Sequence, residues 1–210
     1  MNPGWPVVLD YGAIKLRPMR LRDAGDWRTA RLLSREWLEP WEATAPGARP
    51  ADAGRGYAEA VRALRRDARL GLTFPFGLLV DEQFVGQVTV GAIARGSANS
   101  AYLGYWIAKS HAGRGIMPTA LALVVDHCFA AAGLHRVEAN IRPENVASRR
   151  VVEKLGFRLE GIRERYIHIA GAWSDHLSYA LTIEDVPGGL LKRWLAESGA
   201  VNLPTKVDPL

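Results

Sequence analysis

Cysteine is almost absent from the sequence: Cys128 is the only one in 210 residues. The chain therefore cannot form an internal disulfide, which excludes a fold held together by several of them. No apolar run reaches the roughly 20 residues that a membrane-spanning helix needs, and the first residues lack the charged segment and apolar core of a secretory signal peptide. These absences predict a cytoplasmic protein that does not act in a membrane. Because Cys128 falls within an apolar, helix-like stretch, we interpret it as a buried side chain rather than a nucleophile.

Acidic residues are slightly outnumbered, since 27 lysines and arginines stand against 22 aspartates and glutamates, for a net charge of +5. This balance fits an anionic ligand or a ribonucleoprotein neighbourhood, but it fits an ordinary solvated basic surface as well. No motif typical of nucleic-acid binding is present. Hydrophobic residues make up 48% of the sequence, which is enough for a sizeable core. We expect a single domain over residues 1–210.

A short glycine-containing loop stands between an apolar strand-like run, 103–108, and a long helix-like run, 116–132. The first backbone N–H groups of a helix have no partner within it, and the helix dipole is positive there, so such a junction suits an anion. Gly113 and Gly115 let the backbone approach a phosphate closely because they have no Cβ atom, and Arg114 adds a positive charge. The alternative is an ordinary loop with two turn glycines. The loop lacks the Gly-Lys-Ser/Thr of a P-loop and the third glycine of a dinucleotide-binding fingerprint.

The pattern of apolar residues predicts a mixed α/β fold. The order is one strand, two helices, three strands, a helix, a strand, a helix and two strands, closed by a short helix. We therefore expect a mostly antiparallel, twisted sheet flanked by helices, in which one strand–helix–strand unit supplies a parallel pair. The expected strands cover about residues 14–19, 73–80, 84–93, 101–108, 135–141, 157–166 and 172–183. The expected helices cover about residues 23–33 or 23–37, 54–70, 116–132, 145–155 and 188–197, with Asp23 and Asn145 as N-caps.

Two stretches carry unusual side chains. Trp37 and Trp41 stand in a proline-containing connector, 37–47, where they either pack the loop down or form an apolar wall for a substrate. Arginines gather on the helix expected at 54–70, on faces other than its apolar stripe. They form either a solvated face or a surface that meets an acidic partner or phosphate groups, including those of RNA.

Four motifs carry the strongest indication of function. They are Gly-Tyr-Trp-Ile (104–107) leading into Gly113-Arg114-Gly115, Asn145-x-x-Ser148 followed by Lys-Leu-Gly-Phe (154–157), Arg-Glu-Trp-Leu-Glu-Pro-Trp (35–41), and Trp-Ser-Asp-His (173–176). Together they resemble the GNAT acetyltransferases, and within these the RimJ/RimL branch of ribosomal-protein N-terminal acetyltransferases. The second motif is far more specific than any count of glycines. The resemblance covers about residues 12–185 and leaves a short helix and tail over 186–210.

The resemblance implies acetyl-CoA as co-substrate and no metal ion. The backbone N–H groups of the glycine loop would hold the pyrophosphate, and the pantetheine arm would run along the preceding strand like an extra strand. Ser110 stands where the general GNAT loop has Gln or Arg, which removes one side-chain contact to the pyrophosphate. The predicted cofactor contacts are Trp106, Ile107, Ala108, Ala112, Gly113, Arg114, Gly115, Ile116, Asn145 and Ser148.

The implied reaction is direct attack of an amine on the thioester. Ser148 would stabilise or protonate the leaving thiolate, although Asn145 and Ser148 can instead simply cap their helix. Bacterial relatives often carry a Glu at the position of Asn140 and a Tyr general acid at that of Val152, so the motif does not assign the base. The predicted catalytic residues are Ser148, Asn140 and Glu138. The predicted substrate contacts are Trp37, Trp41, Asp175 and His176. Glu138, Asp175 and His176 are also candidate proton relays, although a purely structural role is the favoured interpretation of each.

The resemblance further implies that the acceptor is a protein N-terminus, such as that of ribosomal protein S5 or a similar chain starting with Ala or Ser, and it is compatible with ribosome association. Two alternatives stay open: a GNAT that acetylates a small amine such as an aminoglycoside or polyamine, and a non-catalytic module that binds acyl-CoA or the ribosome. A polycationic small amine would favour an acidic cleft, whereas the acidic residues of this chain are scattered. The histidines lack the spacing of metal ligands, so we expect no metal site.

Overall fold

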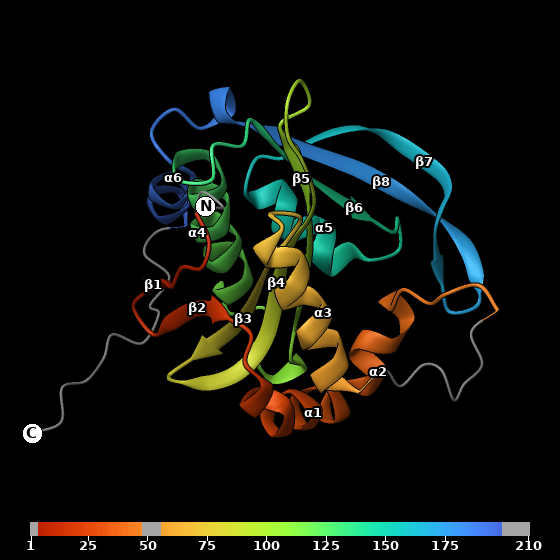
Figure 1. Cartoon of the computed structure of the whole chain (residues 1–210). Helices are drawn as coiled ribbons and strands as arrows, with labels where there is room; N and C mark the ends of the chain where they lie inside the picture. Colours follow the sequence, from red (N-terminus) through yellow and green to blue (C-terminus); the bar gives the residue numbers. More distant parts are fainter. Residues whose placement is uncertain (1–3, 48–55, 199–210) are drawn as a thin grey trace, which may run out of the picture.

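The computed structural model describes residues 4–47 and 56–198, and these have the expected mixture of strands and helices (Figure 1). The strands are β1 (Leu9–Tyr11), β2 (Ile14–Pro18), β3 (Phe74–Val80), β4 (Gln83–Ala94), β5 (Ser100–Ile107), β6 (Arg136–Ile141), β7 (Arg158–Ile169) and β8 (Ala172–Thr182). The α-helices are α1 (Ala24–Leu33), α2 (Arg35–Leu38), α3 (Tyr57–Arg69), α4 (Ile116–Ala130), α5 (Val146–Lys154) and α6 (Leu190–Glu197). The short strand β1 was not predicted, because three residues are too few to establish an alternating pattern. The predicted helix start at Gly54 lies outside the described residues, as does Arg55.

The eight described strands form one sheet in the order β1-β2-β3-β4-β5-β6-β8-β7. All neighbours are antiparallel except β5 and β6, which are parallel as predicted. The parallel pairing is short: it joins Ser100–Tyr102 to Arg136–Glu138 and goes no further. Beyond this point β5 continues to Ile107 and β6 to Ile141 without pairing with each other. The C-terminal parts of the two strands therefore leave a gap in the middle of the sheet.

One face of the sheet packs against α4, whose side chains are buried almost all round, including Leu121 and Cys128. Burial raises the pKa of the Cys128 thiol to about 12, in agreement with an unreactive side chain. Helix α6 packs beside α4, and Asp126 of α4 accepts hydrogen bonds from the first N–H groups of α6. Helices α1 and α3 cover the other face (Figure 1). None of the described helices is both long and apolar enough to cross a membrane.

A buried ion pair links β2 to the turn before α1. Both guanidinium Nη atoms of Arg17 lie 2.8 Å from the carboxylate oxygens of Asp23, and the backbone N–H of Arg20 also donates to Asp23 at 2.8 Å. Asp23 was predicted to cap α1, but its side chain makes no capping bond there. Instead it is 4% exposed and Arg17 8% exposed. Two charges this deeply buried stabilise the fold only as a pair.

We expect Asp23→Asn to lower the free energy of unfolding by about 3–5 kcal/mol, because it leaves the Arg17 charge buried without its partner. Burial disfavours the ionised carboxylate, but the hydrogen bonds from Arg17 and Arg20 outweigh it, so the pKa of Asp23 is lowered. Asp23 therefore contributes its full stabilisation of the fold above its unfolded pKa of about 3.9. This stabilisation is lost as the pH falls through the lower pKa of the folded state. Urea unfolding at neutral and acidic pH checks both points. Asp10→Asn, at an exposed site on β1, should change stability by less than about 0.5 kcal/mol.

Candidate active site

A cavity of about 650 Å³ lies where β5 and β6 separate. Its walls come from α1, α2 and the connector after α2, from the end of β5 with the glycine loop, from the start of α4, and from α5, with one residue of α6. The lining residues are Arg31, Trp37, Leu38, Trp41, Glu42, Ala43, Tyr105, Trp106, Ile107, His111, Ala112, Gly113, Gly115, Ile116, Met117, Pro118, Asn145, Ala147, Ser148, Arg150, Val151, Lys154 and Trp194.

The glycine loop presents backbone N–H groups to this cavity. Gly113 and Gly115 have φ angles of 76° and 74°, the left-handed region that favours glycine. Ala112 was predicted to offer its N–H group, but that group already donates to Lys109 at 3.2 Å. The N–H groups from residue 113 to residue 117 make no hydrogen bond within the described chain, and a Cβ atom built on Gly113 would meet no atom within 4 Å. The loop is thus an open, positively polarised cradle at the start of α4.

On the α5 side of the cavity, the Asn145 and Ser148 side chains have separate tasks. The Asn145 Oδ1 atom accepts a hydrogen bond from the Ser148 backbone N–H at 3.1 Å, so Asn145 caps α5. The Ser148 hydroxyl does not take part in the cap. It donates instead to the Tyr105 hydroxyl at 2.8 Å, and that hydroxyl donates to the Ser148 carbonyl at 3.1 Å. Burial raises the pKa of Tyr105, so its hydroxyl stays protonated at neutral pH.

Helix α2 and the connector after it form the opposite wall. Trp37 and Trp41 both line the cavity, and Trp41 also packs under the Arg142 guanidinium at 5.7 Å. Both tryptophans therefore line the cavity, and the Trp41 contact shows that packing of the loop and a place on the cavity wall do not exclude each other. The connector is tied to the end of β7 by a bridge between Ala43 and Ile169.

Arg31 links this wall to β5. Its guanidinium lies over the rings of Trp27 and Trp106 at 5.2 and 5.3 Å and forms an ion pair with Glu42. Burial lowers the pKa of the Arg31 guanidinium. An arginine stacked between two indoles is held in one orientation, which fixes the carboxylate that it contacts.

The cavity passes through the sheet. Tyr105 and Ile107 pack with the core on the α4 face of β5, whereas Trp106 points to the α1 face, beneath Arg31. All three consecutive residues line the same cavity. The gap between β5 and β6 therefore connects the glycine loop and Ser148 on one face with the tryptophan connector on the other.

Comparison with known proteins identifies the fold. Residues 13–158 match the acetyltransferase (GNAT) domain family. The chain belongs to the GNAT family. The [Ribosomal protein uS5]-alanine N-acetyltransferase of Escherichia coli K12 is 31% identical over 187 residues, which cover 87% of this chain and 94% of that protein. The probable N-acetyltransferase YjcK of Bacillus subtilis is 41% identical over 114 residues, a match that spans 63% of the YjcK chain.

Solved structures show which branch of the GNAT family the chain resembles. Mycobacterium smegmatis RimJ in complex with CoA-disulfide superposes with a TM-score of 0.88 at 41% identity, covering 95% of this chain and 98% of that one. The ribosomal-protein-S5-alanine acetyltransferase of Vibrio fischeri superposes with a TM-score of 0.75 at 28% identity, covering 85% and 98%. The predicted GNAT family, RimJ/RimL branch and acyltransferase class are thereby confirmed, and the CoA compound in the first structure agrees with the predicted co-substrate.

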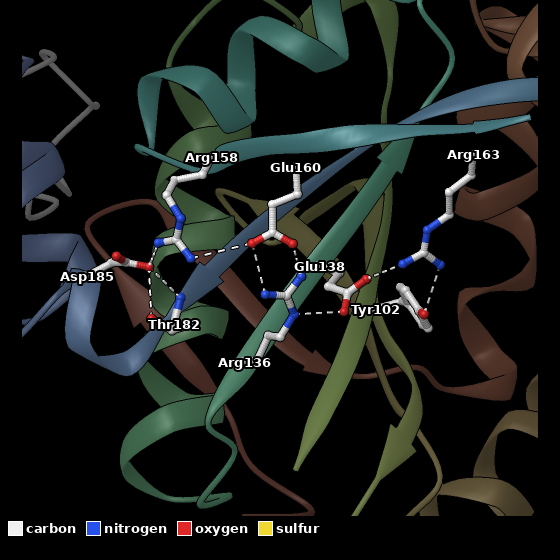
Figure 2. Close-up of polar contacts among 8 residues, drawn as sticks. All are labelled: Tyr102, Arg136, Glu138, Arg158, Glu160, Arg163, Thr182 and Asp185. Carbon is white, nitrogen blue, oxygen red and sulfur yellow. Dashed lines mark hydrogen bonds and ion pairs between the residues drawn. The ribbon is translucent and has the colours of Figure 1, made fainter. Parts of the chain in front are cut away.

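Six predicted GNAT site residues do not line the cavity: four predicted catalytic or substrate contacts and two predicted cofactor contacts. Glu138, on β6, is buried and lies between two arginines, with its Oε1 atom 2.8 Å from Arg136 Nε and its Oε2 atom 2.9 Å from Arg163 Nη2 (Figure 2). The network continues from Arg136 to Glu160 and Arg158 (Figure 2). Because each carboxylate oxygen accepts a hydrogen bond from an arginine, Glu138 on β6 is linked to Arg163 on β7.

Asn140, Asp175 and His176 also lie outside the lining. The buried Asn140 Oδ1 atom has no hydrogen-bond partner in the described chain. Asp175 accepts the Arg165 N–H at 2.7 Å. His176 is buried, and its Nδ1 atom lies 2.9 Å from the Ser174 carbonyl, so Nδ1 carries the proton; burial lowers the pKa of this ring. Of the predicted cofactor contacts, Ala108 and Arg114 are likewise not on the cavity wall.

The structure adds residues that the GNAT motifs did not indicate. Tyr105 was quoted only as part of a strand motif, and Arg31 and Glu42 were not singled out at all. Arg150 and Lys154 stand one turn apart on the exposed face of α5 and add positive charge to the cavity wall. Arg150 follows the Asn-x-x-Ser segment and Lys154 begins the Lys-Leu-Gly-Phe segment, and their separation of four residues, typical of a shared helix face, was the one available indication.

Proposed function

We propose that the chain is an acetyl-CoA-dependent Nα-acetyltransferase that modifies the N-terminal amine of a protein, with the alanine of ribosomal protein S5 as the first acceptor to consider. The observation that carries this proposal is the single cavity that joins the glycine loop to the tryptophan connector through the sheet. Such a passage lets cofactor and acceptor approach from opposite faces and meet beside Ser148. The names of the relatives from Escherichia coli and Vibrio fischeri support the choice of S5.

The residues present fit acetyl-CoA. The unbonded N–H groups from residue 113 to residue 117 and the open space at Gly113 suit a pyrophosphate. Arg150 and Lys154 add cations for further phosphate charge on the same wall. When bound, acetyl-CoA supplies a thioester whose acetyl group passes to the attacking amine in a single displacement.

The chain's own contribution centres on Ser148 and Tyr105. The Ser148 hydroxyl is held by Tyr105 and can turn its proton toward a developing thiolate, because neither hydroxyl is needed for the helix cap. Tyr105 keeps its proton and can donate to Ser148 in turn. The two hydroxyls thus form a short relay that stabilises negative charge in the transition state, the task of a general acid.

An α-amine is the acceptor that needs least help from a base. Its pKa of about 7.7–8.0 lies more than two units below that of about 10.4 for lysine. At pH 7 roughly a tenth of α-amines are neutral, against fewer than about one lysine in a thousand. This difference spares about 3 kcal/mol of deprotonation cost, so a water relay is sufficient without Glu138, Asp175 or His176, which do not line the cavity.

Thiol release from acetyl-CoA with two sets of peptides tests the proposal. One set has a free N-terminal Ala or Ser and blocked lysines, and the other has a blocked N-terminus and free lysines. We expect turnover with the first set only, and with an S5 N-terminal peptide above a scrambled one. Turnover with polyamines or aminoglycosides alone would favour a small-amine enzyme, and tight acetyl-CoA binding without any turnover would favour a non-catalytic module.

A further inference from the structure

We propose that Glu42 is the docking group for the positively charged N-terminus of the acceptor. Among the described residues that line the cavity, Glu42 is the only one with a carboxylate. This inference rests on the proposed function and narrows its substrate class, because a single carboxylate suits an acceptor that brings a single positive charge.

The two ends of the cavity differ in charge. Arg150 and Lys154 lie on α5, at the end that suits phosphate groups. Glu42 lies in the connector, at the other end and on the other face of the sheet, where its negative charge is paired with the positive charge of Arg31. An anionic cofactor is therefore drawn to the α5 end, whereas the Glu42 end repels a cationic acceptor less.

Only one of the two carboxylate oxygens of Glu42 has a partner among the described residues. The Nη2 atom of Arg31 contacts its Oε1 atom, whereas the Oε2 atom has no partner within the described part of the chain. Arg31 is itself fixed between the rings of Trp27 and Trp106. The carboxylate is thus oriented by one cation and keeps one oxygen for a second, which an α-ammonium group supplies. Acetylation turns that ammonium into a neutral amide, so the same contact favours release of the product.

Glu42 also differs in its surroundings from Glu138 and Asp175, the two carboxylates predicted as proton relays. Glu138 is enclosed by Arg136 and Arg163, and Asp175 binds a backbone N–H group. Neither lines the cavity. Of these three carboxylates, Glu42 alone lines the cavity, together with Trp37 and Trp41.

The test compares Glu42→Gln with Glu39→Gln. Glu39 belongs to the same connector, is exposed, pairs with Arg35 and does not line the cavity. For an Ala-starting peptide we expect Glu42→Gln to raise KM about tenfold, a fold-change typical of one charge-assisted contact. The turnover number and the affinity for acetyl-CoA should change less than about twofold. Glu42→Asp should recover part of the loss, since it keeps the charge, and Glu39→Gln should behave as the wild type.

Calorimetric titration of the same peptide into the CoA-loaded protein separates this inference from the proposed function. The wild type should prefer the free peptide to its N-acetylated form, and Glu42→Gln should lose that preference. If the wild type turns over the peptide but Glu42→Gln has an unchanged KM and preference, Glu42 is not the docking group and the proposed function stands. If the wild type shows the preference without turnover, the docking role holds and the proposed function fails. If the wild type neither binds nor acetylates the peptide, both are overturned.

Discussion

Replacing Ser148 with alanine should slow turnover about a hundredfold while leaving the affinity for acetyl-CoA within about twofold of the wild type. General acids contribute roughly 100- to 10,000-fold in rate, and the lower end applies where water can partly substitute. The loss should fall on the turnover number rather than on KM, because the thiolate charge exists only as the bond to sulfur breaks.

The contacts of Ser148 allow its hydroxyl to be removed without disturbing the start of α5. Its side chain is not part of the α5 cap, which uses the backbone N–H of Ser148 and the side chain of Asn145. Alanine therefore removes the hydroxyl without unravelling the helix start, and the thermal midpoint should shift by no more than a few degrees. Steady-state kinetics and isothermal titration with acetyl-CoA measure the two quantities separately.

Tyr105→Phe provides the matched variant. It keeps the Ser148 hydroxyl but removes the partner that orients it, so we expect a smaller fall in turnover, about tenfold. If Ser148 acts only by packing, both variants should retain full turnover, and that result would exclude the relay. Loss of acetyl-CoA binding in Ser148→Ala would instead assign this hydroxyl to the cofactor.

Local sequence was enough to predict that the glycine loop, the start of α4, Asn145 and Ser148 lie together, and they line one cavity. The strand, the glycine loop and α4 follow one another directly, and Asn145 and Ser148 are separated by less than one helical turn. Their mutual geometry is therefore fixed by the regular structure of a few neighbouring residues. The parallel pair also followed from the succession of elements, because a helix between two adjacent strands favours a parallel pair.

The part of the cavity around Arg31 and Glu42 could not be predicted in the same way. Arg31 meets Trp106, more than 70 residues later in the sequence, only because α1 packs against the sheet, and Arg31 in turn pairs with Glu42. Likewise Glu138 resembled a free carboxylate on a strand, but β7 and β8 bring Arg163 against it from 25 residues away. Long-range pairs of charged side chains leave no periodic pattern, since each partner alone looks like an ordinary surface residue.

Replacing Gly113 with valine should weaken acetyl-CoA binding about 100-fold, or roughly 2.8 kcal/mol. Two effects contribute. The φ angle of 76° is strained for a residue with a branched side chain. In addition, the Cβ atom would project into space that is open in the protein and that the pyrophosphate needs, since no protein atom lies within 4 Å of it. Isothermal titration with acetyl-CoA and with CoA measures the loss.

Gly96→Val separates these two effects. Gly96 has a φ angle of 75° and equally open surroundings, but it lies in the turn between β4 and β5 and does not line the cavity. Both variants should therefore lose a similar stability, about 1–2 kcal/mol from backbone strain, whereas only Gly113→Val should lose acetyl-CoA. Equal affinities in the two variants would mean that the loop does not hold the pyrophosphate. A loss confined to Gly113→Val would assign the phosphate to this loop, because the backbone strain is common to both.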